Sequence, residues 1–522
     1  MTLAKASATL LNLGADHYAA GRYDQAQIVY RAILKVRPDH ADSLHMLGVM
    51  AYKQGRNAEA IDLLAKALTL NNHRSDYASN LGNALQQDMR LADAEICYRA
   101  AIVSNPKSAA AYNNLGAVLR AQGRSDEAIV ACETALALRP HYADAHNNLG
   151  IALADVSRFE DAAAQCLAAL ALEPDRHPTR NNLGNVLAHL GRFDEAVAQY
   201  ELAMADTAAI AEVRHNLGMT LLRAGRFEAG WREYEYRWQA RQLSNDRRKF
   251  DQPQWDGAPL GDRTLLIHAE QGFGDTLQFC RYAARIPGRV ILEVQPALVP
   301  LLRGQFGGGV VIAAGDPLPA FDLHCPMMSL PGLVEPRPDP VANAAPYLVA
   351  DPVRQAAWAA RIAPLPGPRV GLVWAGGHRP NQPTLAPVNR RRSTQLQVLA
   401  PLLATPGVSF ISLQKGAPAE ETASLPEGLT LHDFTAELHD FADTAALTAS
   451  LDLVISVDTA VAHLAGALGK PVWLLNRFDS CWRWLADRDD SPWYPTLTQY
   501  RQITPGDWTA PVAAMAADLA RH

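Results

Sequence analysis

Three features are scarce in this sequence, and each scarcity removes a class of protein. The 522 residues include six cysteines and no Cys-x-x-Cys pair, which argues against a zinc ribbon or a thioredoxin-like redox motif. Lys and Arg (48) are fewer than Asp and Glu (54), so nothing indicates a basic surface for nucleic acid. No apolar run approaches the ~20 residues that span a bilayer, and the N-terminal apolar stretch soon becomes amphipathic, so we expect no signal peptide. A cytoplasmic protein without a metal site, a cofactor or a membrane span is expected.

The cysteines that do occur are placed as core residues. Cys97, Cys132 and Cys166 recur at equivalent positions of the repeats described next, where a helix should be buried. Free cysteine behaves as a small apolar residue in such places. We therefore expect packing and a reducing compartment, without disulfides.

An internal repeat is the strongest signal in the sequence. Asn-Leu-Gly recurs at steps of 34 residues, or 68 across one gap that Met46-Leu47-Gly48 fills. Twelve residues after each glycine comes a small residue, and four residues further on an aromatic, aliphatic or cysteine residue. This is the tetratricopeptide pattern. Because one repeat cannot bury its apolar face alone, we expect seven repeats over residues 7–238 to stack into an α superhelix.

The asparagine of each repeat is the candidate acceptor contact. It lies on the first helix of its repeat, which lines the inner groove in this architecture, and a carboxamide can both donate to and accept from a peptide backbone. The predicted ladder consists of Asn12, Asn80, Asn114, Asn148, Asn182 and Asn216. The alternative is that these are consensus surface residues without a ligand.

The last repeat changes character. Trp231, Tyr234, Tyr236 and Trp238 make it aromatic on faces that earlier repeats leave polar. We interpret it as a helix buried against the next domain; a platform for stacking carbohydrate is the alternative.

After Trp238 the period is lost and short apolar runs alternate with helical segments. Such alternation predicts parallel sheets packed between helices. We expect a linker over 239–262, one α/β lobe over 263–366 and a second over 367–522. Two Rossmann-like lobes in tandem are the GT-B architecture, although other two-lobed α/β enzymes share it. The expected strands are 264–269, 290–295, 310–315, 346–350, 370–376, 408–414, 451–457 and 471–476, with a helix over 276–286.

Two loops at carboxyl ends of strands are candidate ligand sites, because parallel α/β sheets bind ligands there. Gly272 and Gly274 in GFGD would let a ligand approach the backbone, and Asp275 could face the cleft or merely cap its helix. In the segment SVDTAVAHLAG, the amides of Thr459, Ala460 and Val461 at a helix start suit a phosphate. Asp458 could accept bonds from sugar hydroxyls; alternatively it is a cap and His463 a packed histidine.

The segments EQGFGDTLQFCRY and VDTAVAHLAGALGKPVWLL together resemble the heptosyltransferase family of GT-B enzymes, glycosyltransferase family 9. The whole chain resembles bacterial repeat-containing glycosyltransferases of that superfamily, including those that modify flagellin. Its asparagine-lined repeats are also similar to those of O-linked N-acetylglucosamine transferases.

The resemblance implies an inverting, metal-independent transfer from a nucleotide sugar, with Asp275 as general base. It implies donor contacts from Arg392 and Ser393, which follow VGLVWAGG, and from Gln414 and Lys415 in SLQKG. It implies further donor contacts from the segment with Asp458, Thr459, Ala460 and His463.

The sequence alone allows more than one class of acceptor. Nothing in the sequence resembles a membrane-docking helix, which favours protein O-glycosylation over transfer to lipopolysaccharide. The alternatives are a glycan-directed transferase whose repeats recruit a partner, and a repeat scaffold with an inactive GT-B domain.

Overall fold

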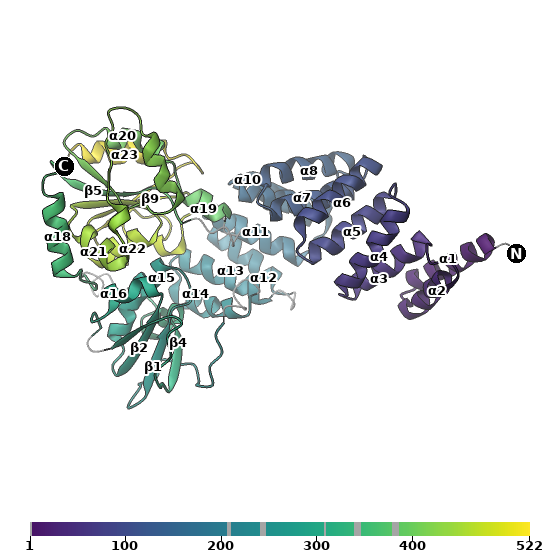
Figure 1. Cartoon of the computed structure of the whole chain (residues 1–522), viewed down its shortest axis with the longest axis horizontal. Helices are drawn as coiled ribbons and strands as arrows, with labels where there is room; N and C mark the ends of the chain where they lie inside the picture. Colours follow the sequence, from purple (N-terminus) through teal and green to yellow (C-terminus); the bar gives the residue numbers. More distant parts are fainter. Residues whose placement is uncertain are drawn as a thin grey trace. The chain divides into compact units, whose positions relative to one another are not determined.

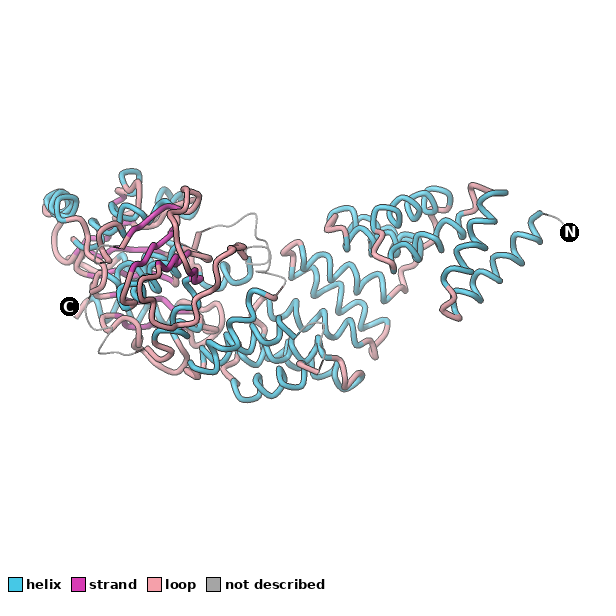
Figure 2. The backbone as a smooth tube through the Cα atoms, turned by 90° about the horizontal axis from the view of Figure 1, so that it is seen from below, coloured by secondary structure: helices cyan, strands magenta, loops and turns pink. Residues whose placement is uncertain are grey.

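The computed structural model describes residues 3–205, 210–240, 247–306, 309–338, 346–377 and 386–521. The chain divides into two compact units, Met1–Asn182 and Leu183–His522. Helices make up the first unit, and the strands of the described residues all lie in the second (Figure 1, Figure 2).

Paired antiparallel helices confirm the tetratricopeptide prediction. Within the described residues the helices are α1 Leu3–Ala19, α2 Tyr23–Val36, α3 Ala41–Lys53, α4 Asn57–Leu70, α5 Ser75–Gln87, α6 Leu91–Ser104, α7 Ala109–Ala121, α8 Ser125–Leu138, α9 Ala143–Asp155, α10 Phe159–Leu172, α11 His177–His189, α12 Phe193–Ala203, α13 Ile210–Arg223 and α14 Phe227–Tyr234. The boundary between the two units falls within α11.

The repeated glycine and its partner explain how the two helices of a repeat approach each other. A Cβ at Gly82 would lie 2.7 Å from Cε1 of Tyr98, and one at Gly116 would lie 2.5 Å from Sγ of Cys132. No side chain fits in that space. Cys132 therefore fills the position that tyrosine fills in other repeats, and it is buried as expected.

The second unit contains two parallel sheets. The first has the order β3-β2-β1-β4, and the second has the order β10-β9-β8-β5-β6-β7. The strands are β1 Thr264–His268, β2 Arg289–Val294, β3 Val310–Ala313, β4 Leu323–Pro326, β5 Arg369–Val373, β6 Ser409–Ser412, β7 His432–Asp433, β8 Leu453–Val457, β9 Val472–Asn476 and β10 Leu497–Arg501.

Helices cover both faces of the second sheet. Apolar residues of α20 and α23 pack with β5, β8 and β9 in one core cluster, while α21 and α22 pack on the opposite face in another (Figure 1). The α-helices that follow α14 are α15 Phe273–Phe279, α16 Val299–Leu302, α17 Leu330–Val334, α18 Pro352–Ile362, α19 Ala386–Arg392, α20 Ala400–Leu403, α21 Phe441–Ala449, α22 Ala460–Ala467 and α23 Thr509–Leu519. The 3-10 segments used below are η1 Glu235–Trp238, η3 Cys280–Arg285 and η10 Trp482–Trp484.

Several expectations need correction. Residues 346–350 are not a strand; the amides of Tyr347 and Leu348 donate to the carbonyl of Ala467 at the end of α22. The helix expected over 276–286 begins at Phe273 and continues as η3 after Phe279. Strands β4, β7 and β10 were not predicted, because their runs are short or interrupted by polar residues.

The aromatic end of the repeats packs within the second unit, as predicted. The Trp231 ring lies edge-on to Trp482, with centroids 5.2 Å apart, and its Nε1 donates to the carbonyl of Pro336. Arg237 of η1 is fully buried and paired with Glu270. The last repeat thus shares its core with the α/β region.

Candidate active site

Four neighbouring strands of the second sheet end at one edge. Because β9, β8, β5 and β6 are adjacent and parallel, the residues after them lie in a row: Arg477, then Asp458, then Trp374 to Gly376, then Gln414 and Lys415. Ligands bind at this edge in α/β proteins. Most of the predicted donor residues therefore share one edge.

Asp458 lies between β8 and α22. Its alternative role as helix cap is wrong, because Thr459 occupies the N-cap position in an extended conformation. Burial acts to raise the pKa of Asp458, but nearby positive charge, including that of Arg392 and Arg477, outweighs it and holds the pKa below its ordinary value. An ionised carboxylate at this edge can accept bonds from hydroxyl groups.

His463 is held on three sides. Its Nδ1 lies 3.0 Å from the hydroxyl of Tyr494, its ring stacks on Trp484 with centroids 4.8 Å apart, and its Nε2 lies 4.0 Å from Oδ1 of Asp458. Burial lowers the pKa of His463 to about 4, so the imidazole is neutral at physiological pH. The packed-histidine alternative is thus supported, and one ring nitrogen still faces Asp458.

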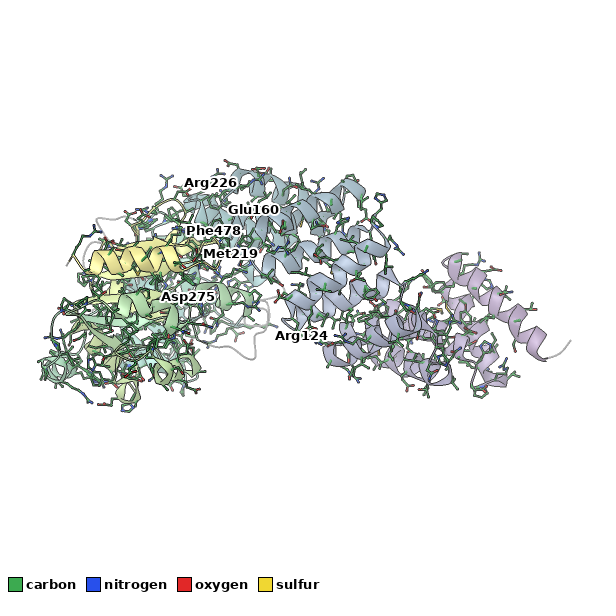
Figure 3. All side chains as sticks on the ribbon, turned by 90° about the horizontal axis from the view of Figure 1, so that it is seen from above. Arg124, Glu160, Met219, Arg226, Asp275 and Phe478 are labelled. Carbon is green, nitrogen blue, oxygen red and sulfur yellow. The ribbon has the colours of Figure 1, made fainter. Side chains whose placement is uncertain are left out.

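The GFGD segment meets α22. A Cβ at Gly274 would lie 2.8 Å from Cδ2 of His463, so this glycine allows close contact between the start of α15 and α22. Asp275, labelled in Figure 3, lies in the first turn of α15. Its Oδ2 accepts from the N–H of Gly272 at 2.9 Å, and its Oδ1 pairs with Arg483. Gly272, not Asp275, is the N-cap of α15; Asp275 is the third helical residue and bonds back to the amide of the cap. Its role as base stays a prediction.

The remaining predicted donor residues form the opposite part of the edge. Ser393 Oγ accepts from the N–H of Gly376 at 3.0 Å, and Nη1 of Arg392 lies 3.4 Å from the carbonyl of Asp458. Lys415 Nζ donates to the carbonyl of Leu438. A hollow of about 400 Å³ lies beside them, lined by Ala375, Gly376, Asn389, Arg390, Ser393, Thr394, Ala417, Pro418 and Glu421.

Gln414 has a structural role that the sequence did not reveal. Its Oε1 accepts from the amides of Trp374 and Ala375 at 3.1 and 2.9 Å, and its Nε2 donates to the carbonyl of Lys415. The side chain is 2% exposed. It joins the loops after β5 and β6, which explains the residue without a ligand.

The asparagine ladder links successive repeats of the first unit. Nδ2 of Asn148 donates to Asn113 at 2.9 Å, and Nδ2 of Asn182 donates to Asn147 at 2.9 Å. Asn114 donates likewise to Asn83, at 3.0 Å, and Asn80 lies 2.8 Å from Nε2 of His45. Asn12 is exposed on α1, and Asn216 lies on α13 in the second unit. Part of the hydrogen-bonding capacity of the ladder is thus used between repeats.

Residues 477–494 contain the functional candidates that sequence reasoning missed. Asp479 is 2% exposed and lies 3.0 Å from both Nδ1 of His189, on α11, and Nε of Arg391, on α19. Arg483, Trp484 and Tyr494 surround Asp275 and His463. The signal was a dense run of tryptophan and arginine directly after a buried strand, at the ligand-binding edge.

Known protein families match parts of both the repeat region and the α/β region. The sequence profile of glycosyltransferase family 9 (heptosyltransferase) matches residues 403–475. Tetratricopeptide-repeat profiles match 11–75, 109–142, 131–177 and 147–211. Residues 403–475 include Lys415, Asp458 and His463 but not Asp275.

Protein FlbA of Caulobacter vibrioides (strain ATCC 19089 / CIP 103742 / CB 15) is 31% identical over 304 residues, which are 53% of this chain and 50% of FlbA. The chain thus spans about half the length of this curated relative. Among solved structures, MamA is 27% identical, over 31% of this chain and 94% of MamA, with a TM-score of 0.29. A thermophilic tetratricopeptide-repeat protein of Thermus thermophilus is 25% identical, over 35% of this chain and 99% of that protein, with a TM-score of 0.31.

No helix among the described residues is both long and apolar enough to cross a membrane. The chain combines tetratricopeptide repeats with a region that matches the profile of glycosyltransferase family 9, a combination consistent with a tetratricopeptide-repeat glycosyltransferase.

Proposed function

We propose that this protein is an inverting, metal-independent GT-B glycosyltransferase that moves a sugar from a nucleotide-sugar donor to a hydroxyl group of a protein. One observation carries the proposal. The start of α15 packs on α22, with Gly274 against His463, so the segments GFGD and VDTAVAH meet although they lie far apart in sequence. This contact supports a shared site for the proposed base and the proposed donor loop, and the donor loop lies within residues 403–475, which match the family 9 profile.

The donor occupies the edge of the second sheet in this proposal. Amides at the start of α22 and the guanidinium of Arg392 bind donor phosphate, because both present positive charge and N–H groups. Lys415 adds charge, and Ser393 borders the hollow, whose size suits part of a nucleoside. Asp458 accepts bonds from sugar hydroxyls. Lobes over 263–366 and 367–522 enclose the donor.

Asp275 acts as the general base. The acceptor oxygen forms a bond to the anomeric carbon as the bond from that carbon to phosphate oxygen breaks, and the electron pair stays on the nucleotide. The proton of the acceptor hydroxyl moves to Asp275. Each oxygen of Asp275 already has one partner, but a carboxylate oxygen has two lone pairs and can still take the proton. A single displacement inverts the anomeric centre.

The repeats supply the acceptor. A peptide backbone in extended form binds the asparagine ladder irrespective of its side chains. Flagellin or another surface protein, glycosylated in the cytoplasm before export, is the acceptor that the resemblance favours.

Intact-mass analysis tests the proposal. The full chain is incubated with flagellin and other candidate proteins and with a panel of nucleotide sugars. We expect a mass gain of one sugar or more, lost in Asp275→Asn, which keeps an oxygen for the Gly272 amide and therefore the cap. Turnover onto glycans alone would move the acceptor from protein to carbohydrate.

The second candidate is a repeat scaffold with an inactive α/β region. It is favoured by the ion pair of Asp275 with Arg483, which occupies the predicted base. Absence of both nucleotide-sugar binding and turnover would support it.

A further inference from the structure

Tyr494 is a buried tyrosine that contacts His463 of the candidate site. Its ring is 1% exposed, and a Cβ at Gly466 of α22 would lie 2.4 Å from it, so the ring is packed tightly against the helix that carries His463. Its hydroxyl lies 3.0 Å from Nδ1 of His463 and 3.5 Å from the hydroxyl of Tyr347. These two contacts decide where the tyrosine proton points.

The proton of Tyr347 is already used. Its hydroxyl donates to the carbonyl of Leu277 at 2.8 Å, and a carbonyl can only accept. The same oxygen accepts from Nη2 of Arg281 at 2.9 Å. Tyr347 therefore has no proton to give Tyr494, and Tyr494 must donate to Tyr347 or to His463.

Distance favours the histidine. A hydroxyl donor binds its acceptor at about 2.5–3.0 Å, so 3.0 Å is a hydrogen bond and 3.5 Å is too long. Tyr494 thus donates to Nδ1, which must be the bare nitrogen. Because the buried ring is neutral, its single proton lies on Nε2.

The surroundings of Nε2 agree with that tautomer. Nε2 lies 4.0 Å from Oδ1 of Asp458, and an N–H directed at a carboxylate is favourable where a lone pair would be repelled. A Cβ at Gly274 would lie 3.5 Å from the same nitrogen, so Nε2 is at the junction of α15 and α22. Stacking on Trp484 holds the plane of the ring, and the hydrogen bond to Tyr494 keeps the Nδ1 edge of the ring toward the tyrosine.

We propose that Tyr494 is a positioning residue that fixes His463 as the Nε2–H tautomer, so that a neutral N–H donates a hydrogen bond to the leaving phosphate oxygen of the donor. This inference rests on the proposed glycosyltransferase function. No proton is transferred from His463: the N–H stabilises the negative charge that grows on the phosphate oxygen as the bond to the anomeric carbon breaks. A neutral donor does not bind the ground-state phosphate as an ion pair, so its effect falls on kcat more than on KM.

Nitrogen NMR of the full chain, labelled at histidine, tests the tautomer without any substrate. The His463 signals are assigned by their loss in His463→Gln. We expect a bare Nδ1 and a protonated Nε2 in the wild type. Tyr494→Phe keeps the ring and removes the proton that Nδ1 accepts, so the other tautomer becomes populated. Tyr347→Phe is the matched control and leaves the tautomer unchanged, because Tyr347 does not contact His463.

Kinetics of donor turnover provide the second measurement. Tyr494→Phe is expected to lower kcat about tenfold, with the KM for donor changed less than about twofold, and His463→Ala about 10²-fold. His463→Gln, whose amide nitrogen matches the position of Nε2, is expected to retain more activity than His463→Asn, whose nitrogen matches Nδ1. In a His463→Gln background, Tyr494→Phe should have little further effect.

Three results would overturn the inference. An unchanged tautomer and kcat in Tyr494→Phe would leave the proposed function standing and remove the role of Tyr494. An effect of Tyr347→Phe as large as that of Tyr494→Phe would show that the Tyr494 proton points to Tyr347. A wild-type protein that turns over no nucleotide sugar would remove the leaving phosphate, and with it both proposals, whatever the tautomer.

Discussion

The first and the last repeats share one 34-residue pattern but use their outer surfaces differently. In the first unit, residues that link successive repeats at the surface stay half-exposed, as in the pair Arg74 and Asp42, whose side chains are 44% and 41% exposed. In the second unit, Trp231, Tyr234 and Arg237 are buried in the core of the α/β region. A periodic pattern therefore predicts the backbone of a repeat, whereas departures from it predict what the repeat packs against.

Truncation is the strongest way to break this comparison. A chain beginning at Arg176 keeps the repeats that pack within the second unit, and we expect it to unfold in one cooperative transition. A chain beginning at Gln239 loses Trp231, Tyr234 and Trp238, each of which is worth about 3–5 kcal/mol when buried. Their sum, about 9–15 kcal/mol, is comparable to the whole stability of a domain, about 5–15 kcal/mol, and other contacts are lost as well.

We therefore expect the shorter chain to aggregate or to unfold without a cooperative transition. Circular dichroism and calorimetry measure both. If a chain beginning at Gln239 kept an unchanged Tm, the last repeats would contribute nothing to the stability of the α/β region.

Arg237 gives the next largest effect. Its side chain is fully buried and pairs with Glu270 at 3.0 Å, while Ser329 also accepts from it. Arg237→Ala leaves the Glu270 carboxylate buried without its partner, at a cost of about 3–5 kcal/mol. Arg232→Ala, at an exposed position of the preceding helix, is the control and should change the free energy of unfolding by less than about 0.5 kcal/mol. Equal effects in denaturant titrations would contradict the assignment of η1 to the core.

The pH dependence of stability tests the burial of the last repeat through the titration of His215. Burial, and then the charge of Arg237, lowers the pKa of His215 to about 4 from an ordinary value of 6.5. The unfolded chain therefore binds a proton between pH 6.5 and 4 that the folded chain does not, so stability falls as pH falls through that range. The loss reaches about 3 kcal/mol at pH 4.

Denaturant titrations of the wild type and of His215→Gln, at pH 6.5 and at pH 4, measure this effect. The variant, which cannot titrate, should lose less stability than the wild type by about that amount. Parallel pH curves for the two proteins would place His215 outside the core.

How far the sequence predicts this molecule depends on whether a feature is periodic. The glycine and its tyrosine or cysteine partner recur at fixed offsets, so the helix pairs follow from sequence. Strands of continuous apolar residues, such as β5 and β8, also follow. The run 346–350 looked the same but bonds to the end of α22, because its neighbours in space are set by tertiary packing.

The candidate site was predictable only in part for the same reason. Asp458 and His463 lie next to a strand and a helix start, which are local signals. The pairing of Asp275 with Arg483 and of His463 with Tyr494 joins positions 208 and 31 residues apart. No local pattern contains such pairs, so the capping and packing roles became visible only in three dimensions.

Substitutions in the asparagine ladder are expected to have the smallest effect. They distinguish the two roles of the ladder, which are to join repeats and to bind a peptide backbone. Asn148 donates to Asn113 across a repeat boundary, and the loss of one such hydrogen bond costs about 1 kcal/mol. Asn148→Asp keeps an acceptor but removes the N–H donor, whereas Asn148→Ala removes both. If the ladder only joins repeats, both variants lose about the same stability and bind acceptor as the wild type does. If the ladder also binds a peptide backbone, the affinity for acceptor falls in both variants. The loss of stability cannot explain that fall, because nearly all of the protein remains folded. Measuring unfolding and acceptor binding on the same samples therefore decides whether the first unit is a spacer or the surface that captures the acceptor.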